Sequence, residues 1–254
     1  MALKRIMPCL LYTGQNLVKT VNFKNPSYIG DPINAIKIYN EKEVDELVLL
    51  DINATKENRP INFGKIEQFA SECFMPFSYG GGVRTLDDFA QLFKIGVEKV
   101  IVNSLIFDNP QVVRDAVNKY ASSSVVASID VKSNFLGKRS VFSHAGRKTE
   151  YDLQRMCAFV QDDLKVGEIL ITSVDREGTW QGYDYDLTQK VVEMASVPVI
   201  ANGGAGEIDH IKKVLYQSDA NAAALGSMAV YQKKGMGVLI KFPARENVII
   251  DEQV

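Results

Sequence analysis

Short apolar runs alternate along the chain with amphipathic segments of helical periodicity. The runs lack the polar–apolar alternation of half-buried strands, so we expect strands that are buried on both faces of a parallel sheet. Eight such runs occupy residues 5–11, 46–52, 75–81, 99–104, 124–130, 168–174, 197–204 and 221–227.

The segments between the runs carry the spacing and the end signals of helices. Asp31 and Asn109 each precede a proline, which places a capping residue before a proline at the first helical position. Thr85 lies three residues before Asp88, close to a capping box. We expect helices near residues 31–43, 62–73, 85–96, 109–120, 150–164, 184–194, 207–216 and 233–241.

Eight strand-then-helix units in a chain of 254 residues are typical of a (β/α)8 TIM barrel of the α/β class. No linker or low-complexity stretch divides the chain, so we expect one domain over residues 1–254. MPFSYGGGV (75–83) matches VPVIANGGA (197–205), and the same spacing carries Glu46 onto Glu168. This repeat indicates two half-barrels. The competing architecture, a doubly wound sheet, usually has fewer strands and does not predict a half-length repeat.

Composition and charge narrow the functional classes. Hydrophobic residues make up 46% and charged residues 24% of the chain, which excludes wholesale disorder. A net charge of −2 offers no basic excess for nucleic acid or an acidic membrane, and no apolar run approaches the roughly 20 residues of a membrane helix. Three widely spaced cysteines favour a reducing cytoplasm. With only His144 and His210, we expect neither a metal site nor a cofactor.

Two glycine-rich clusters follow the carboxyl ends of predicted strands. TIM-barrel enzymes place their active sites at that end of the barrel. Such turns expose backbone N–H groups to an anion. A single cluster of this kind usually only makes a tight turn, but two at repeat-related positions favour a ligand with an anionic group at each end. The two predicted phosphate cradles are Gly81, Gly82, Asn103 and Ser104, and Gly203, Gly204, Gly226 and Ser227.

Carboxylates also close several of the runs. Asp130 follows SVVASI at the centre of the predicted site face, where it could act as a general base or bond to the following loop. Asp51 and Asp175 occupy similar strand ends and could contact substrate or cap local turns. Thr172 lies at another strand end and is a further candidate ligand contact.

Four charged residues lie at the opposite ends of the strands. Arg5, Glu46, Lys99 and Glu168 begin four of the runs, so they could form a neutral ring that closes the barrel floor. The alternative is a set of surface ion pairs with little energetic consequence. The repeat relation between the two glutamates favours the ring.

These residues together resemble the cyclase family of imidazole glycerol phosphate synthase, HisF. The resemblance covers nearly the whole chain, to about residue 230, and rests on long motifs. They are KRIMPCL (4–10), LVKTVNF (17–23), GDP (30–32), DELVLLDI (45–52), GGGVRT (80–85), NS (103–104), ID (129–130), HAGRK (144–148), GEILITSVDREGT (167–179), GYD (182–184) and ANGGAG (201–206).

The resemblance implies a barrel that docks a glutaminase, HisH, on its floor. Ammonia from glutamine would pass a charged gate of Arg5, Glu46, Lys99 and Glu168 and attack a bisphosphorylated ribulosyl-formimino intermediate at the top. The family's pair of catalytic aspartates carries over at one position, Asp130. Its substrate-closing lysine carries over to Lys19, in the long segment after the first strand.

The chain departs from the family at two functional positions. Leu11 stands where the other catalytic aspartate should close the first strand, and leucine cannot transfer a proton. Glu177 replaces the aspartate of the family's DRDG motif, where it remains a candidate substrate contact. With CLLYTG (9–14), this pattern looks like the HisF-like proteins found with sugar-amidation genes of lipopolysaccharide and surface-glycan biosynthesis.

Three functions therefore remain open. The first is an ammonia-handling barrel that pairs with a HisH-like glutaminase and supplies a separate sugar-amidating enzyme. The second is a working histidine-pathway cyclase in which another group replaces the missing aspartate. The third is a scaffold that only activates its glutaminase, which predicts that the cradle residues are dispensable.

Overall fold

A closed barrel of eight parallel strands forms the centre of the computed structural model, which describes residues 3–143 and 149–249. β11 pairs with β1 from Arg5–Ala222 to Pro8–Leu225, and this pairing closes the ring. The predicted TIM barrel and its eight strands are therefore confirmed. In barrel order the strands are β1 (Arg5–Tyr12), β4 (Leu47–Asp51), β5 (Phe77–Gly80), β6 (Lys99–Val102), β7 (Val125–Ser133), β9 (Glu168–Ser173), β10 (Val199–Asn202) and β11 (Ala222–Leu225).

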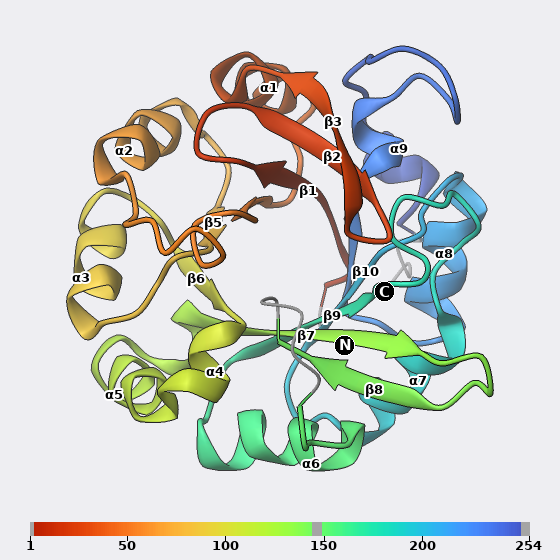
Figure 1. The fold of residues 1–254 in the computed structure, drawn as a ribbon. Helices are drawn as coiled ribbons and strands as arrows, with labels where there is room; N and C mark the ends of the chain where they lie inside the picture. The colour runs from red at the N-terminus through yellow and green to blue at the C-terminus, as the bar shows by residue number, and fades with distance from the viewer. Residues whose placement is uncertain (1–2, 144–148, 250–254) are drawn as a thin grey trace.

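Helices surround the strands as an outer layer (Figure 1). Asp31 caps the first of them by accepting a 3.0 Å hydrogen bond from the Asn34 backbone, and Thr85 and Asp88 form the predicted capping box. The long helices are α1 (Pro32–Glu41), α2 (Phe63–Glu72), α3 (Leu86–Lys94), α5 (Pro110–Tyr120), α7 (Tyr185–Met194) and α8 (Ile208–Tyr216). Shorter ones are α4 (Ser104–Asp108), α6 (Leu153–Ala158), which continues as a π-helical turn over Phe159–Asp163, and α9 (Ser227–Val230).

The helix expected at 233–241 is absent, and that prediction was wrong. Residues 231–241 run as an irregular segment with one antiparallel bridge between Tyr231 and Val238. Gly235 adopts a φ of +75° there, and Gly237 follows two residues later. Two glycines so close together make a helix unfavourable, because each costs about 1 kcal/mol relative to alanine.

Two antiparallel additions to the barrel were not predicted. β2 (Leu17–Val21) and β3 (Lys24–Gly30) form a hairpin after β1, where the sequence suggested a long loop. β8 (Arg139–Phe142) folds back on β7. Each addition follows the first strand of a half-barrel, so the internal repeat extends to these hairpins.

The apolar core is divided by the barrel wall. A large cluster fills the space between strands and helices, and a smaller one fills the barrel interior. The interior cluster consists of Met7, Cys9, Val48, Ile101, Val126, Leu170, Ile200, Ala222 and Ala224. In the described ranges, no helix has the length and apolar character needed to cross a membrane.

Candidate functional site

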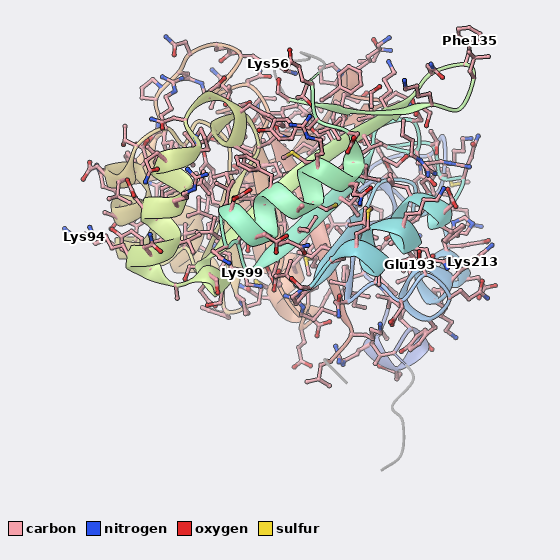
Figure 2. The ribbon with its side chains drawn as sticks, turned by 90° about the horizontal axis from the view of Figure 1, so that it is seen from below. Lys56, Lys94, Lys99, Phe135, Glu193 and Lys213 are labelled. Atoms are coloured by element: carbon pink, nitrogen blue, oxygen red, sulfur yellow. The ribbon has the colours of Figure 1, made fainter. Side chains whose placement is uncertain are left out.

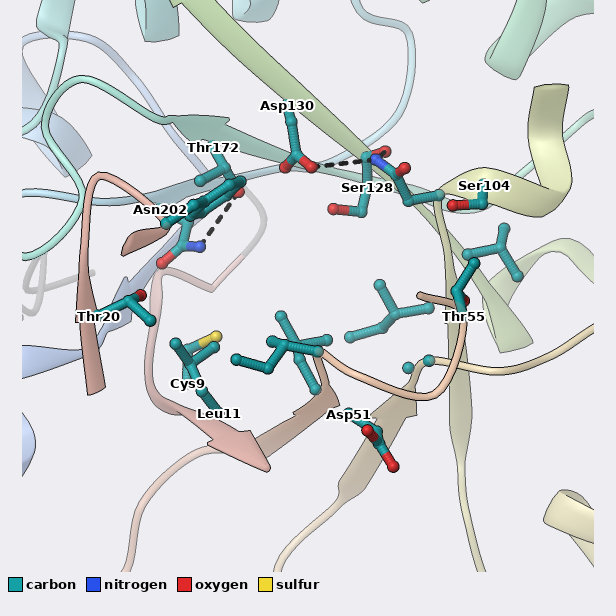
Figure 3. Close-up of a pocket in the computed structure, with 18 of the residues that line it drawn as sticks. Cys9, Leu11, Thr20, Asp51, Thr55, Ser104, Ser128, Asp130, Thr172 and Asn202 are labelled. Atoms are coloured by element: carbon teal, nitrogen blue, oxygen red, sulfur yellow. Dashed lines mark hydrogen bonds between the residues drawn. The ribbon is translucent and has the colours of Figure 1, made fainter. Parts of the chain in front are cut away.

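A cavity of about 470 Å³ opens at the carboxyl ends of the barrel strands. Its lining comes from all eight strands or the turns that follow them, and from the β2–β3 hairpin. Figure 3 shows Asp130 and Leu11 on opposite sides of this pocket. The cavity collects every residue predicted for the two cradles, together with Asp130, Lys19, Asp51, Thr172 and Glu177.

Asp130 is the buried carboxyl group of the site, with 4% of its surface exposed. The side-chain amide of Asn103 donates to its Oδ2 across 3.3 Å (Figure 3). Burial raises the pKa of Asp130 to about 7, although the Lys56 ammonium and a hydrogen bond with Thr172 act to lower that pKa. A carboxyl group with a pKa near neutrality can serve as either general acid or general base.

The wall contributed by β1 is apolar where it faces the pocket. Leu11 is 8% exposed and lines the cavity, and its strand neighbours are Val18 on β2 and Leu50 on β4. Cys9 lines the cavity two residues earlier, and burial raises the pKa of its thiol to about 12, so the thiol is neutral. The β1 wall therefore carries no group that could exchange a proton with a ligand at neutral pH.

Lys19 lies in the β2 strand of the hairpin and not in a solvated loop. It is 7% exposed, and its Nζ donates to Oε1 of Glu177 across 2.5 Å. The other oxygen of Glu177 accepts a 3.1 Å hydrogen bond from the Phe23 backbone. A Cβ added to Gly226 would lie 2.8 Å from Cε of Lys19. The pair thus joins the hairpin to the turn after β9 and lies against the second cradle.

Each cradle contains a glycine that no other residue could replace without a backbone shift. At Gly81, with φ of +112°, a Cβ would lie 2.2 Å from the backbone oxygen of Asp51. At Gly204, with φ of +108°, it would lie 2.2 Å from the backbone oxygen of Gly182. The helices α4 and α9 begin at Ser104 and Ser227, directly beside these turns. Both turns therefore present backbone to the same cavity from two repeat-related positions.

Asp51 and Thr172 lie in the lining but have protein partners. Both carboxylate oxygens of Asp51 accept from Arg59, at 2.8 and 2.9 Å, and Oδ1 also accepts from the Ala54 backbone at 3.0 Å. Thr172 Oγ1 accepts a 3.1 Å hydrogen bond from Asn202 (Figure 3). Asp51 therefore organises the β4–α2 turn, and Asp175 similarly accepts from the Ser133 backbone at 2.7 Å.

Arg5, Glu46, Lys99 and Glu168 form a closed ring at the other end of the barrel. Arg5 contacts Glu46 at 2.8 Å and Glu168 at 3.0 Å, and Lys99 contacts the same two carboxylates at 2.9 and 3.1 Å. Ser78 adds a 2.6 Å hydrogen bond to Glu46. Figure 2 shows Lys99 well separated along the molecule from Lys56, which lines the cavity.

Glu46→Gln is expected to lower the free energy of unfolding by about 3 kcal/mol, because both cations of the ring lose a charged partner that is 2% exposed. Urea denaturation measures the change. Glu72→Gln is the matched control, since Glu72 pairs with Lys37 at 3.6 Å on the surface. Equal, small changes in both variants would show that the ring is only a set of surface ion pairs.

Several cavity residues were missed by sequence reasoning. They are Thr20, Lys56, Arg84, Ser128 and Asn202. Asn202 could have been found from its place before the glycine pair and Thr20 from its place beside Lys19 in LVKTVNF, but Lys56 lies in a segment without a recognisable motif.

No group of three or more histidine, cysteine, aspartate or glutamate side chains suited to a metal ion occurs among the described residues. His144 and the HAGRK motif lie outside the described residues. Within the described lining of the cavity, Asp130 is the carboxyl group whose pKa is raised close to neutrality.

Known proteins are similar in sequence to this chain across most of their length. Residues 5–235 match the family described as histidine biosynthesis protein. A Pseudomonas aeruginosa protein named provisionally as imidazole glycerol phosphate synthase subunit hisF2 is 44% identical, over 96% of this chain and 97% of its own. The imidazole glycerol phosphate synthase subunit HisF of Streptococcus mutans is 40% identical, over 90% of this chain and 91% of its own. The chain belongs to the histidine biosynthesis protein family, as a HisF-type member.

Proposed function

We propose that this chain, acting as one TIM-barrel domain, is the ammonia-using synthase subunit of a glutamine amidotransferase complex that serves amidation of a surface-glycan sugar. A HisH-like glutaminase would dock on the floor, and a separate enzyme would amidate the sugar. We expect the complex to act in the cytoplasm, without a cofactor. The observation that carries this proposal is Leu11, which lines the cavity where the HisF family places a catalytic aspartate.

The barrel interior supports ammonia transfer. The charged ring closes one end, and apolar side chains such as Met7, Val48 and Leu170 fill the space towards the cavity. Neutral ammonia crosses apolar surroundings at far lower cost than a charged ion does. A ring that admits ammonia and an interior that disfavours ammonium suit a route from floor to cavity.

The cavity supports a ligand with anionic groups. Its glycine turns lie at two repeat-related positions, and Ser104 Oγ at the first turn is buried without a hydrogen-bond partner in the described part of the chain. A phosphate oxygen would satisfy that hydroxyl. In this proposal Gly81, Gly82, Asn103 and Ser104 hold one anionic group, and Gly203, Gly204, Gly226 and Ser227 hold the other.

The chain is expected to bind a HisH-like glutaminase through the barrel floor, burying roughly 1,000 Å² or more in total. Co-expression of the two subunits followed by a pull-down at low salt tests this. Lys4, next to Arg5 of the ring, offers a floor position for a charge-reversal variant that should release the partner, whereas reversal of Lys132, exposed at the carboxyl end of β7, should not. Failure of the wild-type chain to associate would contradict the proposal.

The second candidate is the cyclase of histidine biosynthesis itself. It is favoured by the 40% identity to the Streptococcus mutans HisF subunit and by the raised pKa of the buried Asp130. Complementation of a histidine auxotroph that lacks its cyclase separates the two functions. We expect no growth from this chain, and growth equal to that supported by an ordinary HisF would make the histidine function primary.

A further inference from the structure

A buried hydroxyl in the cavity wall has no assigned role. Thr20 on β2 is 4% exposed, and its Oγ1 has no hydrogen-bond partner among the described residues. Unpaired buried polar atoms are uncommon in proteins because they give up hydrogen bonds to water. Three other side-chain atoms share this property, on Ser104, Ser143 and Glu168, but only Thr20 and Ser104 line the cavity.

Thr20 belongs to the same wall as Leu11. β2 lies antiparallel to β1 with Val18 opposite Leu11, and Thr20, two residues after Val18, lines the cavity as Leu11 does. Figure 3 shows the Thr20 side chain reaching from β2 towards the pocket. Asp130 approaches from the other side (Figure 3).

The surroundings of Thr20 favour a neutral group of the ligand over an anionic one. The preceding Lys19 is neutralised by Glu177, and the β1 side chains of Leu11 and Cys9 carry no charge. Thr20 contributes one neutral donor, whereas the glycine turns of the cavity supply the several backbone N–H groups suited to a phosphate. A hydroxyl or carbonyl oxygen of the ligand needs only the one donor that Thr20 offers.

We propose that Thr20 is a specificity-determining residue whose hydroxyl bonds a neutral oxygen in the body of a phosphorylated polyol ligand. This inference rests on the proposed function in one respect, that the cavity holds a ligand by its anionic ends. Leu11 and Cys9 pack against the same side of the ligand, and Thr20 is the hydrogen-bonding group of that side. Loss of this hydroxyl should therefore change recognition of the ligand body and leave phosphate recognition intact.

Calorimetric titration of the full chain with two probes, D-ribose 5-phosphate and inorganic phosphate, tests the inference. Thr20→Val should weaken ribose 5-phosphate binding by about 5- to 10-fold, the worth of one neutral hydrogen bond, and leave phosphate affinity unchanged. Thr20→Ser should retain both affinities. Ser104→Ala should weaken both probes, because Ser104 belongs to a cradle.

Thermal unfolding supplies a structural control. Thr20→Val removes no hydrogen bond within the described chain, so its Tm should equal or exceed that of the wild type. Thr188 is also buried, but its hydroxyl donates to the Asp184 backbone at 3.0 Å, so Thr188→Val should lower the Tm and leave both affinities unchanged.

Three results would overturn the inference. Equal ribose 5-phosphate affinity in wild type and Thr20→Val would show that the hydroxyl does not contact the ligand. Equal weakening of both probes, or a wild type that binds ribose 5-phosphate no more tightly than phosphate, would place Thr20 elsewhere than at the ligand body. A wild type that binds neither probe would instead overturn the ligand-holding cavity, and with it that part of the proposed function.

Discussion

Leu11→Asp is expected to raise turnover of the histidine-pathway intermediate, with free ammonium as nitrogen source, by about 10²–10⁴-fold over the wild-type chain. That range is the usual worth of one general acid–base group. The variant would place a second carboxyl group in the cavity wall across from Asp130, giving the pair of carboxyl groups that the resemblance to HisF implies. A steady-state assay with the purified chain measures the change, because free ammonium removes the need for a glutaminase.

Leu11→Asn is the matched control, since it has the shape and polarity of the aspartate variant without a titratable proton. It should stay at the wild-type rate. A wild-type chain that already matches an ordinary HisF would contradict the amidation proposal and would show that another residue, such as Asp51 or Glu177, transfers the proton. Only an increase in turnover by Leu11→Asp decides the question, because an unchanged rate could also come from a changed pocket or a displaced hairpin.

The strands could be predicted from the sequence because each is buried on both faces. Such burial demands an uninterrupted apolar run, and the run at 5–11 corresponds closely to β1. The hairpin after β1 escaped prediction for a related reason. LVKTV has a buried lysine and a buried threonine among its apolar residues, so neither a continuous run nor a clean alternation marks it as a strand.

The cradles could be predicted because their requirement is local. Gly81 and Gly204 must adopt positive φ values against nearby backbone, and that requirement leaves glycine in the sequence whatever the rest of the fold does. The helix expected at 233–241 is absent for a local reason of the same kind, since Gly235 adopts a positive φ and Gly237 follows two residues later.

Contacts between distant segments could not be predicted from spacing. Lys19 and Glu177 are separated by 158 positions, and only the folded barrel reveals that their charges cancel. Thr20 Oγ1 has no partner among the residues that the structure describes, and this too depends on the assembly, because a buried hydroxyl usually finds a partner. The floor ring was predictable in outline because the internal repeat relates Glu46 to Glu168.

Asp130→Asn is expected to stabilise the fold at neutral pH and to have little effect near pH 4. Burial raises the pKa of Asp130 to about 7 in the folded chain, against a reference value of 3.8. The folded chain therefore binds this proton more tightly than the unfolded chain, so the free energy of unfolding falls as pH rises from about 4 to 7. A pKa shift of this size corresponds to a loss of roughly 4 kcal/mol in the free energy of unfolding at neutral pH. Asparagine avoids this loss because its side chain does not titrate.

Urea denaturation of both proteins between pH 4.5 and 8 measures the effect as the difference in unfolding free energy, which should grow with pH and level off above pH 7. Asp209→Asn, at an exposed position on α8, supplies the baseline. The difference is taken as the unfolding free energy of Asp130→Asn minus that of the wild type. Its sign at neutral pH distinguishes a functional role of Asp130 from a structural one. An aspartate that only secures its neighbours would lose hydrogen bonds and stability on conversion to asparagine, so a negative difference would assign Asp130 a structural role. A gain in stability together with lost turnover in the Leu11→Asp background would show that the fold tolerates a buried, destabilising carboxyl group because the chemistry of the cavity requires it.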